Sequence, residues 1–427
     1  MASNDVVHAE TDPAVYDEYR EKWSALPEDE AGWLQRAKDV GAVLDVDAAQ
    51  REREKKSPRA EVALLKHSGL TKILGPKKYG GGEQPLSLGY KVVREVAKSD
   101  GSIGMLLGYH LLWSLTGNIV GSAEQADRLQ ELIITNNYFL GGAVNPRDGD
   151  LKITEEGDNI VFNGFKNFST GGVISDLTVL EGVLEGTENH IFAVVKSDQL
   201  QFQRNWNNIG VRLSESGSVK IENVKAPWTD ALGWNVEKKE PDLSILGIPW
   251  ATLLLPAIQL IFSNLYLGIA QGAVTTAAKY TNSTTRPWPY GGDNKEKATD
   301  EFYILSNYGN WHAHLRAAEA LANVAGQEID VFYKKGTPDR TKVTAADRGE
   351  LAETIASLKV VTTDTGLRVT NGVFEVTGAR ATSFRVNLDR FWRDIRTHSL
   401  HDPVAYKNRE LGRYQLLGEI PEPTWYT

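Results

Sequence analysis

The pattern of apolar and polar positions divides this chain of 427 residues into three regions. Up to residue 140, apolar residues recur at helical spacing. This pattern predicts helices over 15–38, 86–100 and 103–119. Between residues 141 and 240, short runs rich in β-branched residues alternate with turn residues. They predict strands near 152–154, 160–163, 177–184, 190–195, 200–203 and 218–221.

Helical periodicity returns from residue 241 onward. It predicts four long helices, over 256–280, 303–334, 344–370 and 384–400. Four long helices with short connections favour a four-helix bundle. The expected fold is therefore α+β and mainly α. It has an N-terminal helical domain (1–140), a central antiparallel β-domain (141–240) and a C-terminal four-helix bundle with a tail (241–427).

Two segments allow more than one interpretation. The stretch from Ser244 to Ala278 has no charged residue and is long enough to cross a membrane. Pro249 and Pro256 interrupt it, and no basic cluster flanks it, so we interpret it as a buried helix of a large helical assembly. The mixed charges of Arg51–Lys56 are interpreted as a solvated helix face.

Composition narrows the functional classes. The net charge of -9 argues against nucleic acid as a partner, because phosphate binding needs a basic surface. The chain has no cysteine, which excludes disulfides, thiolate metal sites and cysteine nucleophiles. Its N-terminus lacks the apolar core of a signal peptide, so a cytoplasmic protein is expected.

The segment from His398 to Asp402 contains the most informative ionisable residues. His398 and His401 share one face if the segment is helical, and Pro403 restricts Asp402 to non-helical geometry. Histidine titrates near neutrality and is the usual acid or base, although His398 could also be a helix-end histidine with satisfied hydrogen bonds. No third ligand is near in sequence, so we predict no metal site.

Two polar segments could bind a flat, phosphorylated ligand. Phe168, Ser169 and Thr170 precede two glycines, where the backbone could approach a ring closely; an ordinary hairpin end is the alternative. Ser214 and Ser216 could bind phosphate or form a simple turn. Two arginines, at 286 and 380, could make bidentate phosphate contacts or surface ion pairs.

Seven motifs appear together, in a fixed order, between residues 85 and 410. They are SIGMLLGYH (102–110), NGFKNFSTG (163–171), NWNNIGVRLSESGSV (205–219), QLIFSNLYLGIA (259–270), TRPW (285–288), GVFEVTGAR (372–380) and DRFWRDIRTHSLHDPVAYK (389–407). With them the chain resembles the acyl-CoA dehydrogenase superfamily. Within it, the chain resembles most closely the flavin-dependent dibenzothiophene monooxygenases.

The resemblance implies a two-component monooxygenase. A separate flavin reductase would supply reduced FMN, and O2 would add to it as a C4a-hydroperoxide that oxygenates an aromatic or heterocyclic substrate. FMN is expected rather than FAD, because residues 374–380 lack the glutamine and most of the glycines of the superfamily's adenine-binding turn. The resemblance also implies a homotetramer.

The resemblance assigns roles to individual residues. Phe168 and Thr170 would contact the flavin ring, and His401 would stabilise the oxygen adduct or move a proton. Ser169, between the two flavin contacts, and His398, beside His401, are further candidates. The two arginines at 286 and 380 would reach the flavin phosphate from a neighbouring subunit. Ser214 and Ser216 are further candidates for cofactor binding through their own hydroxyl chemistry. The substrate pocket would comprise Tyr109, His110, Trp113, Asn145 and Trp206.

One departure from the family stands out. Family members have an asparagine, near the start of the β-domain, that contacts the flavin oxygen adduct, and the matching position here is Gly142, with Asn145 three residues on.

Two alternative functions remain open. One is an FAD-dependent acyl-CoA dehydrogenase or oxidase with Asp402 as base, and the other is a non-catalytic helical oligomer of the same fold.

Overall fold

The computed structural model describes residues 9–145, 150–291 and 295–424. The N-terminal residues 1–8, which bear on the signal-peptide expectation, lie outside this range. The first region is helical, as predicted. Its helices are α1 (Glu18–Lys22), α2 (Glu30–Asp45), α3 (Ala48–Glu54), α4 (Arg59–His67), α5 (Leu86–Ala97), α6 (Gly101–Ser114), α7 (Thr116–Val120) and α8 (Ala123–Asn136).

The central region forms one seven-stranded sheet and a small two-stranded sheet. The strands are β1 (Leu140–Ala143), β2 (Lys152–Glu156), β3 (Asn159–Lys166), β4 (Leu177–Leu184), β5 (His190–Lys196), β6 (Gln201–Phe202), β7 (Val219–Pro227), β8 (Trp234–Asn235) and β9 (Glu240–Pro241). Strand order in the large sheet is β1-β4-β2-β3-β7-β6, with β5 also paired to β4. The prediction of a purely antiparallel domain needs correction, because β1 and β2 both pair with β4 in parallel.

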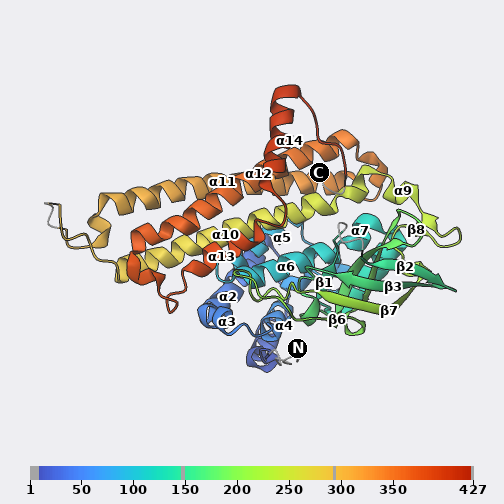
Figure 1. Ribbon diagram of the computed structural model, residues 1–427, viewed down its shortest axis with the longest axis horizontal. Helices are drawn as coiled ribbons and strands as arrows, with labels where there is room; N and C mark the ends of the chain where they lie inside the picture. Colours follow the sequence, from blue (N-terminus) through green and yellow to red (C-terminus); the bar gives the residue numbers. More distant parts are fainter. Residues whose placement is uncertain (1–8, 146–149, 292–294, 425–427) are drawn as a thin grey trace.

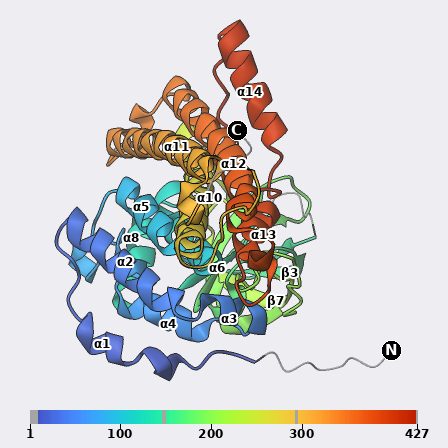
Figure 2. The same cartoon turned by 90° about the vertical axis from the view of Figure 1, so that its left-hand side faces the viewer.

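The third region consists of the short α9 (Leu243–Leu246) and the long helices of the bundle. They are α10 (Leu254–Ser283), α11 (Phe302–Lys335), α12 (Ala345–Thr377), α13 (Asp389–His398) and α14 (Val404–Leu417). α10 is the axis of the molecule, with α5, α6, α11, α12 and α13 around it (Figure 1, Figure 2). α14 projects beyond the bundle and contacts α12.

The main hydrophobic core joins the first and third regions and includes some residues of the β-region, such as Leu177 and Val179. One continuous cluster of buried residues runs from Trp23 in the N-terminal region to Ile395 in α13, and a second cluster lies within the β-region. Two apolar helical windows, Gly101–Val120 and Pro249–Ser283, are long enough to cross a membrane, but each is 94% buried inside the protein. The uncharged segment is therefore a core helix, as predicted.

The helix predictions fail where the backbone breaks. The segment 15–38 is interrupted around Pro27, before the Asp29 side chain caps α2. The helix predicted over 384–400 begins only at Asp389, because Asn387 adopts a positive φ of 54° that an α-helix does not allow. α14 lies beyond all the predicted helices. Lys407 is its sole buried residue, so its apolar pattern is weak.

The interpretation of Arg51–Lys56 as a solvated face is wrong for two of its residues. Arg51 and Glu52 on α3 are buried. The guanidinium of Arg51 pairs with Asp100 at 2.8 Å and donates to the carbonyl of Leu44. Glu52 pairs with Arg393 at 2.6 Å. The mixed charges of this short helix therefore include residues that form a buried ion pair between α3 and α13.

Candidate active site

A chain of buried hydroxyl groups lies where the segment after β3 meets the loop before β7. The Thr170 hydroxyl is 2.8 Å from that of Ser216, which is 2.7 Å from that of Ser214. All three side chains are buried. The Ser169 hydroxyl donates to the carbonyl of Gly217 at 2.6 Å, which fastens the two segments together. The structure therefore brings together four residues that the sequence identified in two separate motifs.

The backbone around these hydroxyls is strained. Phe168 has a positive φ of 59°, and Arg204, Val211 and Glu215 in the facing loop also have positive φ values. Non-glycine residues in this region cost free energy, and such residues cluster at ligand sites. The Phe168 ring is 63% exposed and meets the half-buried Trp206 edge-on at 6.4 Å. An exposed aromatic ring beside buried hydroxyls is suited to stacking on a flat ligand.

Asp394 on α13 fixes the facing loop. Its Oδ1 accepts a hydrogen bond from the amide of Val211 at 2.6 Å, and the indole of Trp206 donates to the carbonyl of Val211 at 2.8 Å. Burial raises the pKa of Asp394 to about 7, although the Val211 amide and Arg390 oppose the rise. The loop that bears Ser214 and Ser216 thus depends on one buried carboxyl group.

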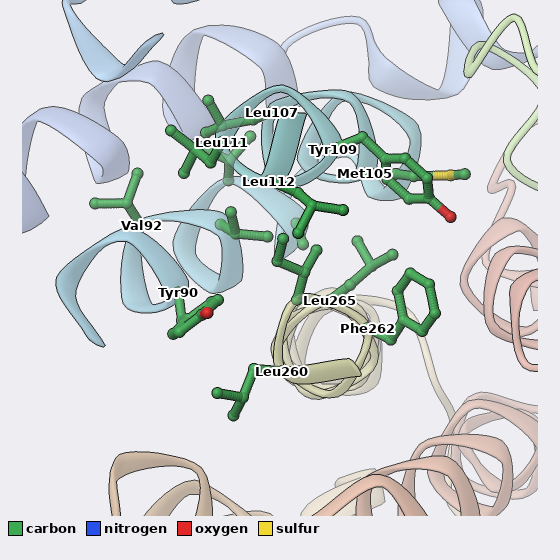
Figure 3. Close-up of a cluster of buried hydrophobic side chains, with 14 of the residues drawn as sticks. Tyr90, Val92, Met105, Leu107, Tyr109, Leu111, Leu112, Leu260, Phe262 and Leu265 are labelled. Atoms are coloured by element: carbon green, nitrogen blue, oxygen red, sulfur yellow. The ribbon is translucent and has the colours of Figure 1, made fainter. Parts of the chain in front are cut away.

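Aromatic side chains of α6 and α10 form the adjoining wall. The Tyr109 ring stacks on Phe262 at 5.9 Å and meets Trp113 at 6.4 Å. Figure 3 shows Tyr109 and Phe262 side by side at one edge of the core formed between α6 and α10. A small cavity between α5, α6 and α10, lined by Tyr90, Leu111 and Ile261, is almost wholly apolar and poorly suited to catalysis. The candidate site therefore lies on the Tyr109 side of α6, where polar side chains are present.

His398 is fully buried between two tyrosines. Its Nδ1 is 2.8 Å from the Tyr266 hydroxyl, and its Nε2 is 3.3 Å from the Tyr109 hydroxyl. Burial, aided by the nearby His401, lowers the pKa of His398 to about 3, so the ring is neutral near pH 7. A neutral imidazole has one N–H and one acceptor, so one tyrosine donates to it and the other accepts. Both of its nitrogens are satisfied.

His401 lies just beyond α13 and is exposed. Its ring is 4.8 Å from that of Phe262 and 6.0 Å from that of His398. Its Nδ1 is 3.3 Å from the Asp402 carboxylate, which leaves Nε2 to face a ligand. His401 therefore combines exposure with an orienting carboxylate, which is the usual arrangement of an acid–base histidine.

Asp402 is in turn held by groups from two bundle helices. It forms an ion pair with Lys359 of α12 and accepts a hydrogen bond from Gln259 of α10 at 3.2 Å. Burial alone would raise the pKa of Asp402, but the hydrogen bond from His401 and the Lys359 ammonium outweigh it and hold the pKa well below its usual range. A carboxylate so strongly stabilised as the anion is a weak base.

Gly142 on β1 joins the hydroxyl cluster to the aromatic wall. Its amide donates to the carbonyl of Thr170 at 3.4 Å. A Cβ at this position would lie 2.3 Å from Cε2 and 2.5 Å from Nε1 of Trp113. The indole therefore occupies the space that a side chain at 142 would need. The carbonyl of Asn145 accepts from Lys166 at 2.8 Å, just beyond β1.

The assignment of His110 to a substrate pocket does not fit the structure. The His110 ring is fully buried and stacks on Phe139 at 4.8 Å. The Leu140 amide donates to Nδ1 at 3.0 Å, so Nε2 carries the proton and donates to the Thr71 carbonyl at 2.8 Å. Both ring nitrogens are engaged with the backbone, and burial lowers its pKa to about 4. His110 is a structural link between β1 and the turn at Thr71.

The two arginines expected at a phosphate lie far along the molecule. Arg286 follows the end of α10 and is exposed, and Arg380 follows α12 and is exposed too. Thr285 lies near the end of α12, with its hydroxyl 3.4 Å from the carbonyl of Thr377. Arg286 is twenty residues beyond Tyr266, or about 30 Å along a helix. Within one chain, neither arginine joins the hydroxyl cluster.

Sequence reasoning missed four residues that complete the site: Phe262, Tyr266, Lys359 and Asp394. A signal existed for three of them. Phe262 and Tyr266 are four residues apart and share one face of a mainly apolar helix, and Lys359 is the one charged residue in the run from Thr354 to Thr363. In residues 9–145, 150–291 and 295–424, no group of three or more histidine and acidic side chains could hold a metal ion.

Comparison with known families agrees with this geometry. The sequence matches the acyl-CoA dehydrogenase N-terminal domain over residues 38–136 and the acyl-CoA dehydrogenase C-terminal domain over residues 260–405. It is 37% identical to a dibenzothiophene monooxygenase of Rhodococcus erythropolis over 88% of this chain and 91% of that protein. It is 32% identical to a probable FMNH2-dependent monooxygenase of Pseudomonas putida over 92% and 96% of the two chains.

Solved structures give the same result. The dibenzothiophene monooxygenase TdsC of Paenibacillus sp. A11-2, in complex with FMN and indole, superposes with a TM-score of 0.85 at 33% identity. The alignment covers 92% of this chain and 99% of TdsC. The methanesulfinate monooxygenase MsuC of Pseudomonas fluorescens superposes with a TM-score of 0.86 at 34% identity, covering 92% and 99%.

Proposed function

Because the chain belongs to the dibenzothiophene monooxygenase family, within the acyl-CoA dehydrogenase superfamily, we propose that it oxidises the sulfur of a fused-ring aromatic heterocycle. The protein is a flavin monooxygenase that uses reduced FMN and O2. The observation that carries the substrate proposal is the continuous wall of Tyr109, Trp113 and Phe262 beside His401. Such a wall is suited to a flat aromatic ligand.

The residues of the hydroxyl cluster fit a flavin. Phe168 offers an exposed ring for stacking, and the Thr170 hydroxyl, whose neighbours are also hydroxyls, can reorient to donate to a ring nitrogen or carbonyl. Reduced FMN supplies the two electrons that activate O2, so that one oxygen atom is transferred to sulfur and the other leaves as water. The aromatic wall excludes bulk water from the reacting atoms.

His401 is the proposed proton donor and acceptor. Asp402 orients its Nδ1, and Nε2 can therefore give a proton to the departing oxygen or take one from it. His398 has a different proposed role. Its neutral ring, fixed between Tyr109 and Tyr266, holds the Tyr109 hydroxyl in place beside the substrate.

The dehydrogenase alternative loses support at Asp402. A base for α-proton abstraction must accept a proton near neutral pH, and the ion pair with Lys359 keeps the pKa of Asp402 far too low for this task. No observation in the described part of the chain favours that reaction over oxygenation.

The proposal includes partners. Arg286 and Arg380 are exposed and follow the ends of α10 and α12, so they would serve the flavin phosphate of a neighbouring subunit, in a homotetramer. A separate flavin reductase would deliver reduced FMN by diffusion, in the cytoplasm.

The decisive experiment combines flavin and oxygen. Purified protein binds photoreduced FMN without oxygen, and is then mixed with buffer containing 18O2 and dibenzothiophene. We expect a slow return of the oxidised-flavin absorbance and one labelled oxygen atom on sulfur. Immediate reoxidation with release of free FMN, or a purified protein that holds FAD tightly, would contradict the proposal. Incorporation of labelled oxygen into an indole or an alkyl sulfinate, but not into dibenzothiophene, would refute the proposed substrate class but not the monooxygenase function.

A further inference from the structure

The indole N–H of Trp113 is a buried donor with no hydrogen-bond partner. The side chain is 6% exposed and belongs to the aromatic wall of α6. A buried N–H without a partner destabilises the folded protein, and folded proteins keep few of them. Other tryptophans of this chain show the usual solution: the indoles of Trp206 and Trp250 donate to backbone carbonyls at 2.8 and 3.1 Å.

Two further described tryptophans, Trp33 and Trp228, also have unpaired indole N–H groups. Trp228 packs against Trp234 inside the β-region, and Trp33 lies on α2 against Gly82. Both belong to the structural core. Trp113 differs from them because its neighbours are Tyr109 of the aromatic wall and Gly142 beside the hydroxyl cluster.

The position of the Trp113 ring depends on Gly142. The atoms Cε2, Nε1 and Cζ2 of the indole all come within 2.7 Å of the place where a Cβ on residue 142 would lie. Even alanine at 142 would force the ring to move. Gly142 in turn donates its amide to the carbonyl of Thr170, so the indole edge lies directly over the link between β1 and the hydroxyl cluster.

We propose that the Trp113 indole donates a hydrogen bond to an oxygen atom of the ligand bound beside Gly142, and that the absence of a side chain at 142 admits the indole to that position. The inference rests on the proposed function, because it takes the ligand to be a flavin or an aromatic sulfur compound. The shared chemistry is an acceptor oxygen: a carbonyl of the flavin ring or the oxygen of a sulfoxide. Gly142 and Trp113 together then favour ligands that have an oxygen acceptor at this position as well as a complementary shape.

The test is a binding experiment that requires no turnover. Equilibrium dialysis gives the affinities of wild type and Trp113→Phe for oxidised FMN, for dibenzothiophene and for dibenzothiophene sulfoxide. Phenylalanine keeps an aromatic ring in the wall but has no donor. Dibenzothiophene (the sulfide) and its sulfoxide differ only by the acceptor oxygen. A change in the affinity for the sulfide therefore reports a change in pocket shape rather than the loss of a hydrogen bond. Gly142→Ala is the second variant, since it displaces the indole without removing it.

Loss of the hydrogen bond should weaken binding by about three- to tenfold. If Trp113→Phe weakens the sulfoxide but not the sulfide, the acceptor is on the substrate. If it weakens FMN and leaves the sulfide unchanged, the acceptor is on the flavin. Gly142→Ala should weaken the same ligand. Unchanged affinities for both acceptor ligands, or an equal loss for sulfide and sulfoxide, would overturn the inference. Failure of wild type to bind photoreduced FMN in the anaerobic experiment described above would instead refute the proposed function.

Discussion

The ammonium group of Lys359, buried on α12, forms an ion pair with the carboxylate of Asp402, the residue that orients His401. Lys359 is 1% exposed, and burial lowers its pKa while Asp402 opposes the fall. The three residues form a relay from the middle of the bundle to the surface of the candidate site. The core of the bundle thereby sets the orientation of an exposed histidine.

Replacing Lys359 by methionine should impair oxygenation through Asp402. Without the ammonium group, burial dominates and the pKa of Asp402 rises, so the carboxylate orients His401 only at higher pH. We expect oxygenation to fall at least tenfold near pH 7, in part recoverable at higher pH. A pH–rate profile measures this shift. Lys407→Met is the matched control, since Lys407 is equally buried on α14 but pairs with Glu410. If the low-pH side of the pH–rate profile of oxygenation does not shift in Lys359→Met, the proposed link from Lys359 through Asp402 to His401 is contradicted.

His401→Ala tests the acid–base role directly. The variant should keep its fold and its affinity for FMN, because His401 is exposed and lies outside the hydroxyl cluster. Oxygenation should fall by about 10²–10⁴, the usual contribution of a positioned proton donor. The exposed His312 on α11, replaced by alanine, provides the control. Full oxygenation by His401→Ala would exclude the assigned role.

The hydroxyl of Thr170 can be removed with little change of shape. In Thr170→Val, Ser216 keeps its partner Ser214, so the hydroxyl cluster survives. We expect FMN affinity to fall by about three- to tenfold, the effect of one lost hydrogen bond. Thr170→Ser retains the hydroxyl and should bind FMN as wild type does. Titration of the flavin absorbance distinguishes the two variants, and equal affinities for both would remove Thr170 from the flavin site.

The sequence located the long helices well and the polar relay poorly. Periodicity placed α10, α11 and α12 because each repeats its apolar positions over eight or more turns. The start of α13 was misplaced because the hydrophobic pattern does not reveal the positive φ at Asn387. α14 was missed because it is mostly exposed and therefore has few periodic apolar positions. Thr170 could be proposed because glycines and hydroxyls stand together in one short segment. Asp394 could not, since its partner Val211 is 183 residues away in sequence. The spacing of Tyr266 from Phe262 was a signal for Tyr266 itself, but its pairing with His398, 132 residues away, could not be predicted.

His110 illustrates why a local motif cannot separate packing from chemistry. Tyr109 and His110 are neighbours on α6, but they face different sides of the helix. We expect His110→Ala to reduce thermal stability by several kcal/mol, because it removes two hydrogen bonds and a stacked ring. The KM for the aromatic substrate should stay unchanged. A large rise in KM in a variant of normal stability would restore His110 to the substrate pocket.

Asp394→Asn should change the pH dependence of stability. The folded chain holds the Asp394 proton up to about pH 7, whereas the unfolded chain releases it near pH 3.8. Between these values the unfolded state binds fewer protons, so this group makes stability fall as pH rises, by at most about 1.4 kcal/mol per pH unit. Asparagine keeps an oxygen to accept the Val211 amide hydrogen bond but does not titrate.

The stability of the asparagine variant relative to wild type should therefore increase from pH 5 to pH 7 and level off above. Urea unfolding of both proteins at each pH gives this difference. His110 and His398, whose pKa values are lowered to about 4 and about 3, have the opposite effect, since stability is lost as pH falls below 6.5. Both histidines are present in wild type and variant, so their effect cancels in the difference. A difference that is constant across this range would show that Asp394 is already ionised in the folded protein.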